Sequence, residues 1–182
     1  MWLWIIVAIV VVLLLLVLST YNSLVRLNNR VEEAFSTMDV YLKKRWDLIP
    51  NIVETVKGYA KHEKETLEGV VSLRNGAYDK MSDDEKVEAN NKLSQGITKI
   101  MALAESYPDL KANENFKDLS KELSSVEEDI ANARKYYNGS VRDFNNKVQV
   151  FPNNIFAGMF GFKRKTMYEA LDSERENVKV EF

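Results

Sequence analysis

The chain opens with a continuous run of apolar side chains, and no charged residue precedes Arg26. As a helix, this run is about 25 Å long, close to the hydrocarbon thickness of a bilayer. Trp2 and Trp4 stand at one end and Tyr21 at the other, where aromatic rings favour the headgroup layers. A core helix of a soluble protein normally keeps one polar face, which this run lacks. We therefore predict a transmembrane anchor over residues 1–20, with the lipid bilayer as its partner.

A cleavable signal peptide is the main alternative for this run. Such a peptide needs a positive amino-terminal region and a small-residue cleavage site. The chain has no Lys or Arg before the apolar run, and residues 19–22 offer no such site. We therefore predict an uncleaved single span. The positive charges of Arg26 and Arg30 follow the span and favour a cytoplasmic location for the rest of the chain.

Beyond the anchor, apolar residues recur at alternating three- and four-residue steps, which places them on one face of a helix. Neither Gly nor Pro occurs between residues 19 and 24, so this helix is expected to continue from the anchor without a break. The face of this first helix consists of Leu24, Leu27, Val31, Ala34, Met38 and Tyr41.

A second helix is predicted over residues 48–77. Asp47 would be its N-cap, and Pro50 would lie in its first turn, where a missing N–H costs little. In the alternative, one helix continues through Pro50 with a kink. The later helices would then run in the opposite directions to those expected.

The third and fourth helices have clearer boundaries. Ser82 and Glu85 match a capping box, and the helix that they begin must end before Pro108. The fourth helix is predicted over residues 113–150, and Gly139 within it leaves room for another helix to pack closely. The pattern predicts an all-α fold, in which the anchor continues into an antiparallel bundle of about four long helices.

The end of the fourth helix is expected to return to the membrane. This helix is about 57 Å long, whereas the first helix provides only about 42 Å beyond the anchor. The segment that follows would then meet the bilayer through apolar burial and attraction to anionic headgroups. These membrane-surface or partner contacts are Ile155, Phe156, Met159, Phe160, Phe162, Lys163, Arg164 and Lys165. In the alternative, the same aromatic residues close the end of the bundle.

The predicted organisation has four parts. They are an anchor at 1–20, a helical bundle at 21–151, an aromatic and basic segment at 152–165, and a tail at 166–182 to which we assign no role.

Composition excludes several functions. The 25 basic and 27 acidic residues give a net charge of −2, which argues against nucleic acid as a partner. With no cysteine, the chain has no disulfide, no catalytic thiol and no thiolate metal ligand. The one histidine, His62, begins a stretch in which Thr66 stands where a zinc-protease motif needs its second histidine. We therefore expect no catalytic residue, no metal and no cofactor, and predict that the protein is not an enzyme.

Four separated motifs resemble those of the LemA family of bacterial membrane proteins. They are RWDLIPNIVETVKGYA at 45–60, YPDLKANENF at 107–116, ARKYYN at 133–138 and FPNNIFAGMFGF at 151–162. The resemblance implies a single amino-terminal span in a bacterial cell membrane and a domain of long antiparallel helices. It implies no reaction. Some relatives in that family are associated with magnetosome membranes, a role that does not transfer to this chain by resemblance alone.

The function predicted from these observations is a non-enzymatic, membrane-anchored helical scaffold. It would self-associate as a homo-oligomer or organise an unidentified protein partner at the membrane, because the span concentrates the chains in two dimensions. The alternative is an adaptor or sensor module that binds one specific peptide or membrane-protein partner.

Overall fold

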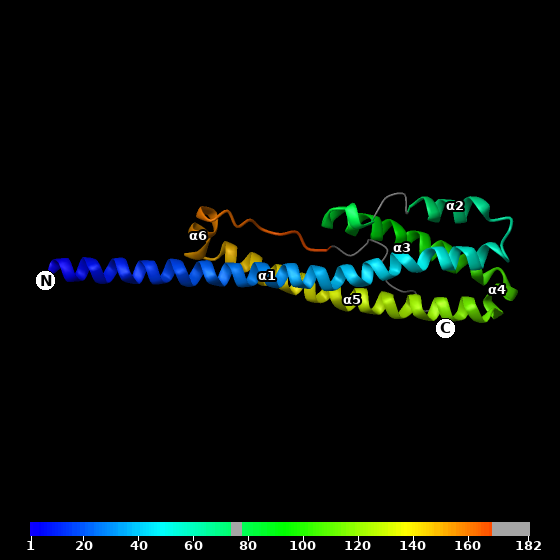
Figure 1. Cartoon of the computed structure of the whole chain (residues 1–182), viewed down its shortest axis with the longest axis horizontal. Helices are drawn as coiled ribbons and strands as arrows, with labels where there is room; N and C mark the ends of the chain where they lie inside the picture. The colour runs from blue at the N-terminus through cyan, green and yellow to red at the C-terminus, as the bar shows by residue number, and fades with distance from the viewer. Residues whose placement is uncertain (74–77, 169–182) are drawn as a thin grey trace, which may run out of the picture. The chain divides into compact units, whose positions relative to one another are not determined.

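The computed structural model describes residues 1–73 and 78–168, which form helices and turns without a β-strand (Figure 1). The predicted all-α class is confirmed. The elements are α1 (Trp2–Lys57), α2 (Lys64–Ser72), the 3-10 helix η1 (Tyr78–Lys80), α3 (Asp83–Glu105), α4 (Pro108–Ala112), α5 (Glu114–Gln149) and α6 (Asn153–Met159).

The described chain forms two compact units. Unit 1 comprises Met1–Thr37 and Ala133–Tyr168, and unit 2 comprises Met38–Asn132. Both α1 and α5 contribute residues to each unit. The antiparallel packing of all the helices as one bundle, and the four-part domain organisation, remain predictions.

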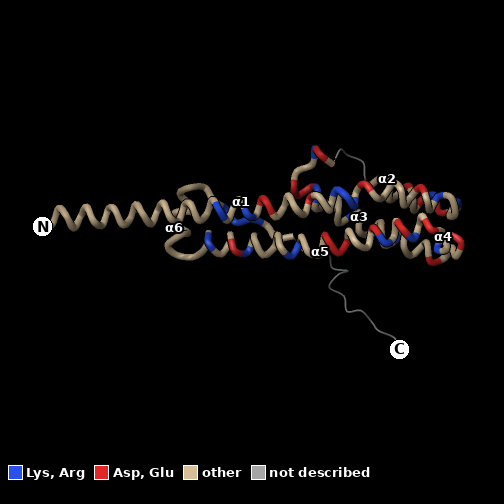
Figure 2. Tube along the Cα trace, turned by 60° about the horizontal axis from the view of Figure 1, so that its bottom comes forward, with Lys and Arg blue, Asp and Glu red and all other residues tan. Residues whose placement is uncertain are grey.

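The amino-terminal part of α1 is long and apolar enough to cross a membrane, and it is a candidate span. Its side chains are exposed, including Trp2 at 82% and Trp4 at 75%. Figure 2 shows that this part of the helix carries no charge. An exposed apolar helix of this length is unstable in water, so lipid is the environment that suits it.

In unit 1, α1 and α5 run in opposite directions. The Phe35 ring packs against Tyr137 at 5.7 Å between centroids, whereas Tyr21 packs against Phe162, which follows α5. The core of this unit consists of Val31, Val141 and Phe144, bordered by Leu27, Tyr137, Val148 and Phe162. The room that Gly139 leaves is not used by another helix, because no described atom lies within 4 Å of a Cβ built there.

In unit 2, the predicted helix start at residue 48 is wrong, since α1 continues to Lys57 with Pro50 inside it. Asp47 is therefore not an N-cap; its carboxylate accepts hydrogen bonds from Lys43 one turn earlier. A proline inside a helix costs about 3 kcal/mol. The buried side chains of Ile49 and Ile52, on either side of Pro50, contribute packing that offsets this cost. Of the predicted second helix, the segment Lys64–Ser72 forms α2, and residues 74–77 lie outside the described ranges.

The starts of the other long helices agree with the sequence. Ser82 and Glu85 form the predicted capping box of α3. The Asn113 side chain accepts a hydrogen bond from the Phe116 N–H at 3.0 Å and so caps α5. The short α4, with Pro108 at its first turn, lies between the predicted third and fourth helices.

Candidate membrane-surface segment and helical groove

The segment after α5 lies beside the end of the apolar run of α1. The Thr20 hydroxyl donates a hydrogen bond to the Asn153 side chain at 3.3 Å, and Thr20 is only 8% exposed. The Tyr21 ring meets the Phe160 ring edge-on, with 4.9 Å between centroids. These contacts, both within unit 1, hold α6 beside α1 (Figure 1), at the point in the sequence where the apolar run of α1 ends.

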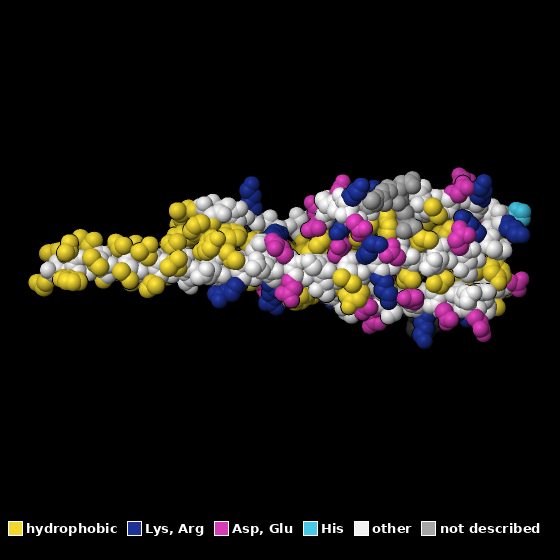
Figure 3. All heavy atoms as spheres, viewed as in Figure 1, with side chains coloured by type: hydrophobic (Ala, Val, Ile, Leu, Met, Phe, Trp, Pro, Cys, Tyr) yellow, Lys and Arg dark blue, Asp and Glu magenta, His cyan; other side chains and the backbone are white. Residues whose placement is uncertain are grey.

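The predicted site residues on and after α6 divide into inward and outward groups. Phe162 packs against Phe144 in the core of unit 1, and Phe156 is half-buried. The side chains of Ile155, Met159 and Phe160 are exposed, Met159 at 73%. Figure 3 shows hydrophobic side chains over α6 continuing onto the neighbouring apolar part of α1. The packing of unit 1 therefore covers the aromatic side chain of Phe162 and part of Phe156, and it leaves that of Phe160 exposed.

Two asparagines of α5 fix the extended segment that follows α6. Asn145 donates to the Lys165 carbonyl and accepts from its N–H, and Asn138 does the same with Tyr168. The seven-residue step from Asn138 to Asn145 rises about 10.5 Å along the helix, and the three-residue step from Lys165 to Tyr168 spans about 10 Å of extended chain. The two asparagines and their two partners therefore match in spacing. Sequence reasoning missed these asparagines. Their seven-residue spacing is visible in the chain, but their partners follow no periodic pattern.

The three basic site residues follow the turn after α6. Lys163 and Arg164 are exposed. Lys165 is half-buried, with its ammonium 3.7 Å from the Glu32 carboxylate and 5.6 Å from the centre of the Phe144 ring. Two cations are thus presented to the surroundings, and the third is engaged within unit 1.

Unit 2 contains a buried arginine that links three helices. Arg45 of α1 is 2% exposed and donates to the side-chain oxygen of Asn90, to Ser94 on the same helix, and to Glu127 of α5 at 2.9 Å. Arg45 and Glu127 form an ion pair in which the arginine is buried and the carboxylate is partly exposed. Because every hydrogen bond of this guanidinium serves packing, the cluster is structural.

A buried tyrosine lies near the start of α3. The Tyr78 hydroxyl donates to the Asp39 carboxylate at 2.7 Å, and Lys86 donates to the other oxygen of Asp39. Burial raises the pKa of Tyr78 well above its ordinary value, and the neighbouring Asp39 charge raises it further. Tyr78 therefore stays protonated as a hydrogen-bond donor throughout the physiological range.

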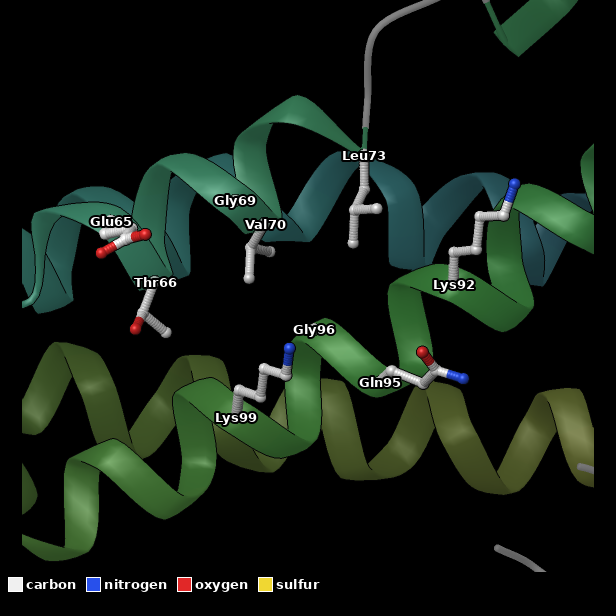
Figure 4. Close-up of a pocket in the computed structure, with 9 residues that line it drawn as sticks. All are labelled: Glu65, Thr66, Gly69, Val70, Leu73, Lys92, Gln95, Gly96 and Lys99. Carbon is white, nitrogen blue, oxygen red and sulfur yellow. The ribbon is translucent and has the colours of Figure 1, made fainter. Parts of the chain in front are cut away.

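A groove of about 400 Å³ runs between α2 and α3 in unit 2 (Figure 4). Its floor contains Val70 and Gly96, and a Cβ built at Gly96 would come within 3.1 Å of Val70. The rim carries Lys92 and Lys99 on α3. This arrangement offers apolar contact beside the ammonium groups of Lys92 and Lys99, with Glu65 and Thr66 of α2 also in the lining.

The residues that sequence analysis weighed for catalysis are not assembled into a site. His62 is exposed in the turn between α1 and α2. Within residues 1–73 and 78–168, no group of three or more His, Asp or Glu side chains is placed to hold a metal ion.

The geometry defines a class of protein: a helical domain joined directly to a candidate membrane span. The model of the LemA family matches residues 34–182, and the chain belongs to this family. It is 28% identical over 161 residues to Protein LemA of Metamycoplasma hominis, covering 86% of this chain and 72% of that one.

Magnetosome proteins are also similar to this chain. Identity is 23% to MamQ 2 of Paramagnetospirillum magneticum, over 84% of this chain and 66% of that one. Identity is also 23% to MamQ of Magnetospirillum gryphiswaldense, over 81% and 64%. The chain thus spans slightly less than two thirds of the length of these magnetosome relatives.

Proposed function

We propose that the protein is a non-enzymatic, membrane-anchored scaffold that self-associates at a bacterial cell membrane and organises partner proteins there. The observation that carries the proposal is the direct passage of α1 from its exposed apolar run into packed structure. Thr20 is already buried, and Leu24 is fully buried. A flexible tether would leave several exposed polar residues between anchor and domain. Here the packed residues begin at the end of the span, which suits the display of helix faces close to the bilayer.

The absence of an enzymatic role is part of the proposal. It is supported by the buried ionisable groups, which form hydrogen bonds between helices. Arg45 is engaged by Asn90, Ser94 and Glu127, and Tyr78 by Asp39. A catalytic group usually lies in a cleft with its reactive atom available to substrate. These groups instead hold helices together, in keeping with a binding or structural role.

Self-association is tested by crosslinking in native membranes. We expect an amine-reactive crosslinker to give discrete oligomers at low expression, because the span confines the chains to two dimensions. The apolar run lacks a Gly-x-x-x-Gly motif, so the helical domain is the proposed source of the contact. The matched control exchanges residues 1–18 for an unrelated span. Oligomers that vanish with this exchange, or monomers at every density, contradict the proposal.

We propose that the helical domain lies in the cytoplasm. Arg26 and Arg30 are exposed on α1 just after the apolar run, where positive charge favours the cytoplasmic side. A Gly69→Cys variant gives the only thiol in the chain, at an exposed position of α2. A membrane-impermeant maleimide should label it only after cells are permeabilised. Labelling of intact spheroplasts would place the domain outside.

The second candidate function is an adaptor, which the groove between α2 and α3 favours. The occupant that we propose is a partner peptide with an apolar side chain against Val70 and an acidic residue near Lys99. Gly69→Leu would obstruct the groove, whereas Gly139→Leu makes the same change at another open helical glycine. Loss of one stoichiometric companion from the Gly69 variant alone would support the adaptor over the scaffold.

A further inference from the structure

We propose that α6 and the basic turn after it form a second membrane contact, in which they lie on the anionic phospholipid headgroups of the bilayer crossed by α1. The inference is independent of self-association, because it concerns one chain and its lipid. It requires only that the apolar run of α1 spans the membrane.

The first support is the position of α6 along α1. At the helical rise, Thr20 lies about 27 Å from Trp2, which is close to the thickness of the hydrocarbon layer. The hydrogen bond from Thr20 to Asn153 and the contact between Tyr21 and Phe160 hold α6 beside this point of α1. Tyrosine prefers the interface between hydrocarbon and headgroups. The contact surface is therefore continuous with the surface that the span itself presents to lipid (Figure 3).

The second support is the uncovered apolar face. Ile155 and Met159 lie four residues apart, on one side of α6, and Phe151 lies in the turn before the helix. Their side chains are 52%, 73% and 75% exposed. The inward side of the helix, with Ala157 only 1% exposed, is already packed. Such a division is typical of a helix that lies in the plane of a membrane interface.

The third support is charge. Residues 151–168 contain Lys163, Arg164 and Lys165 but no Asp or Glu, and α1 has no acidic residue before Glu32. Arg26 of α1 is exposed in the same unit. The part of unit 1 beside the span thus exposes Arg26, Lys163 and Arg164, which complement anionic lipid. This complementarity selects lipid over an apolar protein partner as the occupant.

The fourth support is that the segment is held in place before it meets lipid. Asn145 binds both the N–H and the carbonyl of Lys165, which fixes the backbone next to Arg164. The Tyr137 hydroxyl donates to the Thr166 carbonyl at 3.1 Å. Ordering a loop on binding lowers affinity, so a prearranged segment retains more of its attraction to the surface.

The test uses the intact chain in nanodiscs, because the absence of cysteine allows a single fluorescent label to be placed by one substitution. Met159→Cys reports on α6, and Val40→Cys, 65% exposed in the native chain and farther along α1, is the matched control. In discs that contain phosphatidylglycerol, brominated lipid should quench the label at position 159 and acrylamide should not reach it. The label at position 40 should be quenched by acrylamide and not by brominated lipid.

Charge is tested separately. Lys163→Gln/Arg164→Gln should shift the label at position 159 toward acrylamide, whereas Lys117→Gln/Lys121→Gln, the same loss of charge on exposed residues of α5, should not. Salt should act like the first variant, since the screening length falls from about 10 Å at 0.1 M to about 3 Å at 1 M. Equal acrylamide access at positions 159 and 40 overturns the proposal. Protection from acrylamide without quenching by brominated lipid identifies a protein on α6 instead, and also overturns it.

Discussion

Arg45 is a cation whose side chain is 2% exposed, and its replacement by methionine should destabilise unit 2 by about 3 kcal/mol. Methionine keeps much of the length of the side chain but cannot donate a hydrogen bond. The Asn90 side-chain oxygen accepts from Arg45 at 3.0 Å and 3.2 Å, and Asn90 is fully buried. It would lose both donors without gaining water.

The magnitude follows from what each former partner can do. An orphaned buried acceptor costs about 1–3 kcal/mol, which applies to Asn90. The Glu127 carboxylate is 39% exposed and can be hydrated, so its loss should add only about 0–1 kcal/mol. Ser94 can still donate to the Asn90 carbonyl, as it does at 3.2 Å in the native chain. Together these terms give about 1–4 kcal/mol, a range whose upper part overlaps the lower end of the roughly 3–5 kcal/mol found when one partner of a buried ion pair is removed.

Thermal unfolding of the intact chain in detergent, followed by circular dichroism of its helices, measures this effect. A loss of about 3 kcal/mol corresponds to a Tm decrease of about 6–12 °C for a domain of this size. The matched control is Arg45→Met/Asn90→Leu, which removes the orphaned acceptor as well and should recover part of the loss. A decrease below about 2 °C for the single variant, or no recovery in the double variant, would refute the reasoning.

Three further predictions concern individual side chains. Gly139→Ala should stabilise the chain by about 0.5–1 kcal/mol in the same assay, because the position is helical and open, whereas Gly96→Ala should gain less, since its Cβ would press on Val70. Tyr78→Phe should cost about 1 kcal/mol near pH 7. Because the pKa of Tyr78 is raised, its hydrogen bond contributes fully to stability below the ordinary tyrosine pKa of about 10, and this contribution declines above that pH. The variant lacks the contribution, so its stability should fall less between about pH 9 and pH 11 than that of the native chain. Ser82→Ala should cost about 1 kcal/mol, and an NMR titration should find the lowered pKa of Glu85 moved part of the way back, since the Ser82 N–H still donates to it.

Local features of this fold were predictable where the signal lies within a few residues. The capping box of Ser82 and Glu85, the Asn113 cap and the unbroken helix after the anchor each depend on neighbouring positions in the chain. The predicted helix start near Pro50 was wrong because packing outweighed the local preference of proline for the first turn of a helix. The buried Ile49, Ile52 and Val53 hold the helix on both sides of it, and only the tertiary structure reveals this.

The long-range polar contacts were beyond sequence reasoning. Arg45 is separated from Asn90 by 45 positions and from Glu127 by 82, and hydrophobic periodicity carries no information on such pairs. The candidate membrane-surface segment was predictable as a composition of aromatic and basic residues. Which of its side chains point outward, Met159 rather than Phe162, depends on the core of unit 1 and required the structure.

The mass of the intact protein in native nanodiscs, with co-purifying proteins identified, tests the central claim most directly. The claim is that an anchored helical domain of the LemA family self-associates at the membrane. It predicts a discrete multiple of the chain mass that persists when the discs are diluted. A monomer with no companion would contradict this account, and a monomer with one stoichiometric companion would replace the scaffold with the adaptor.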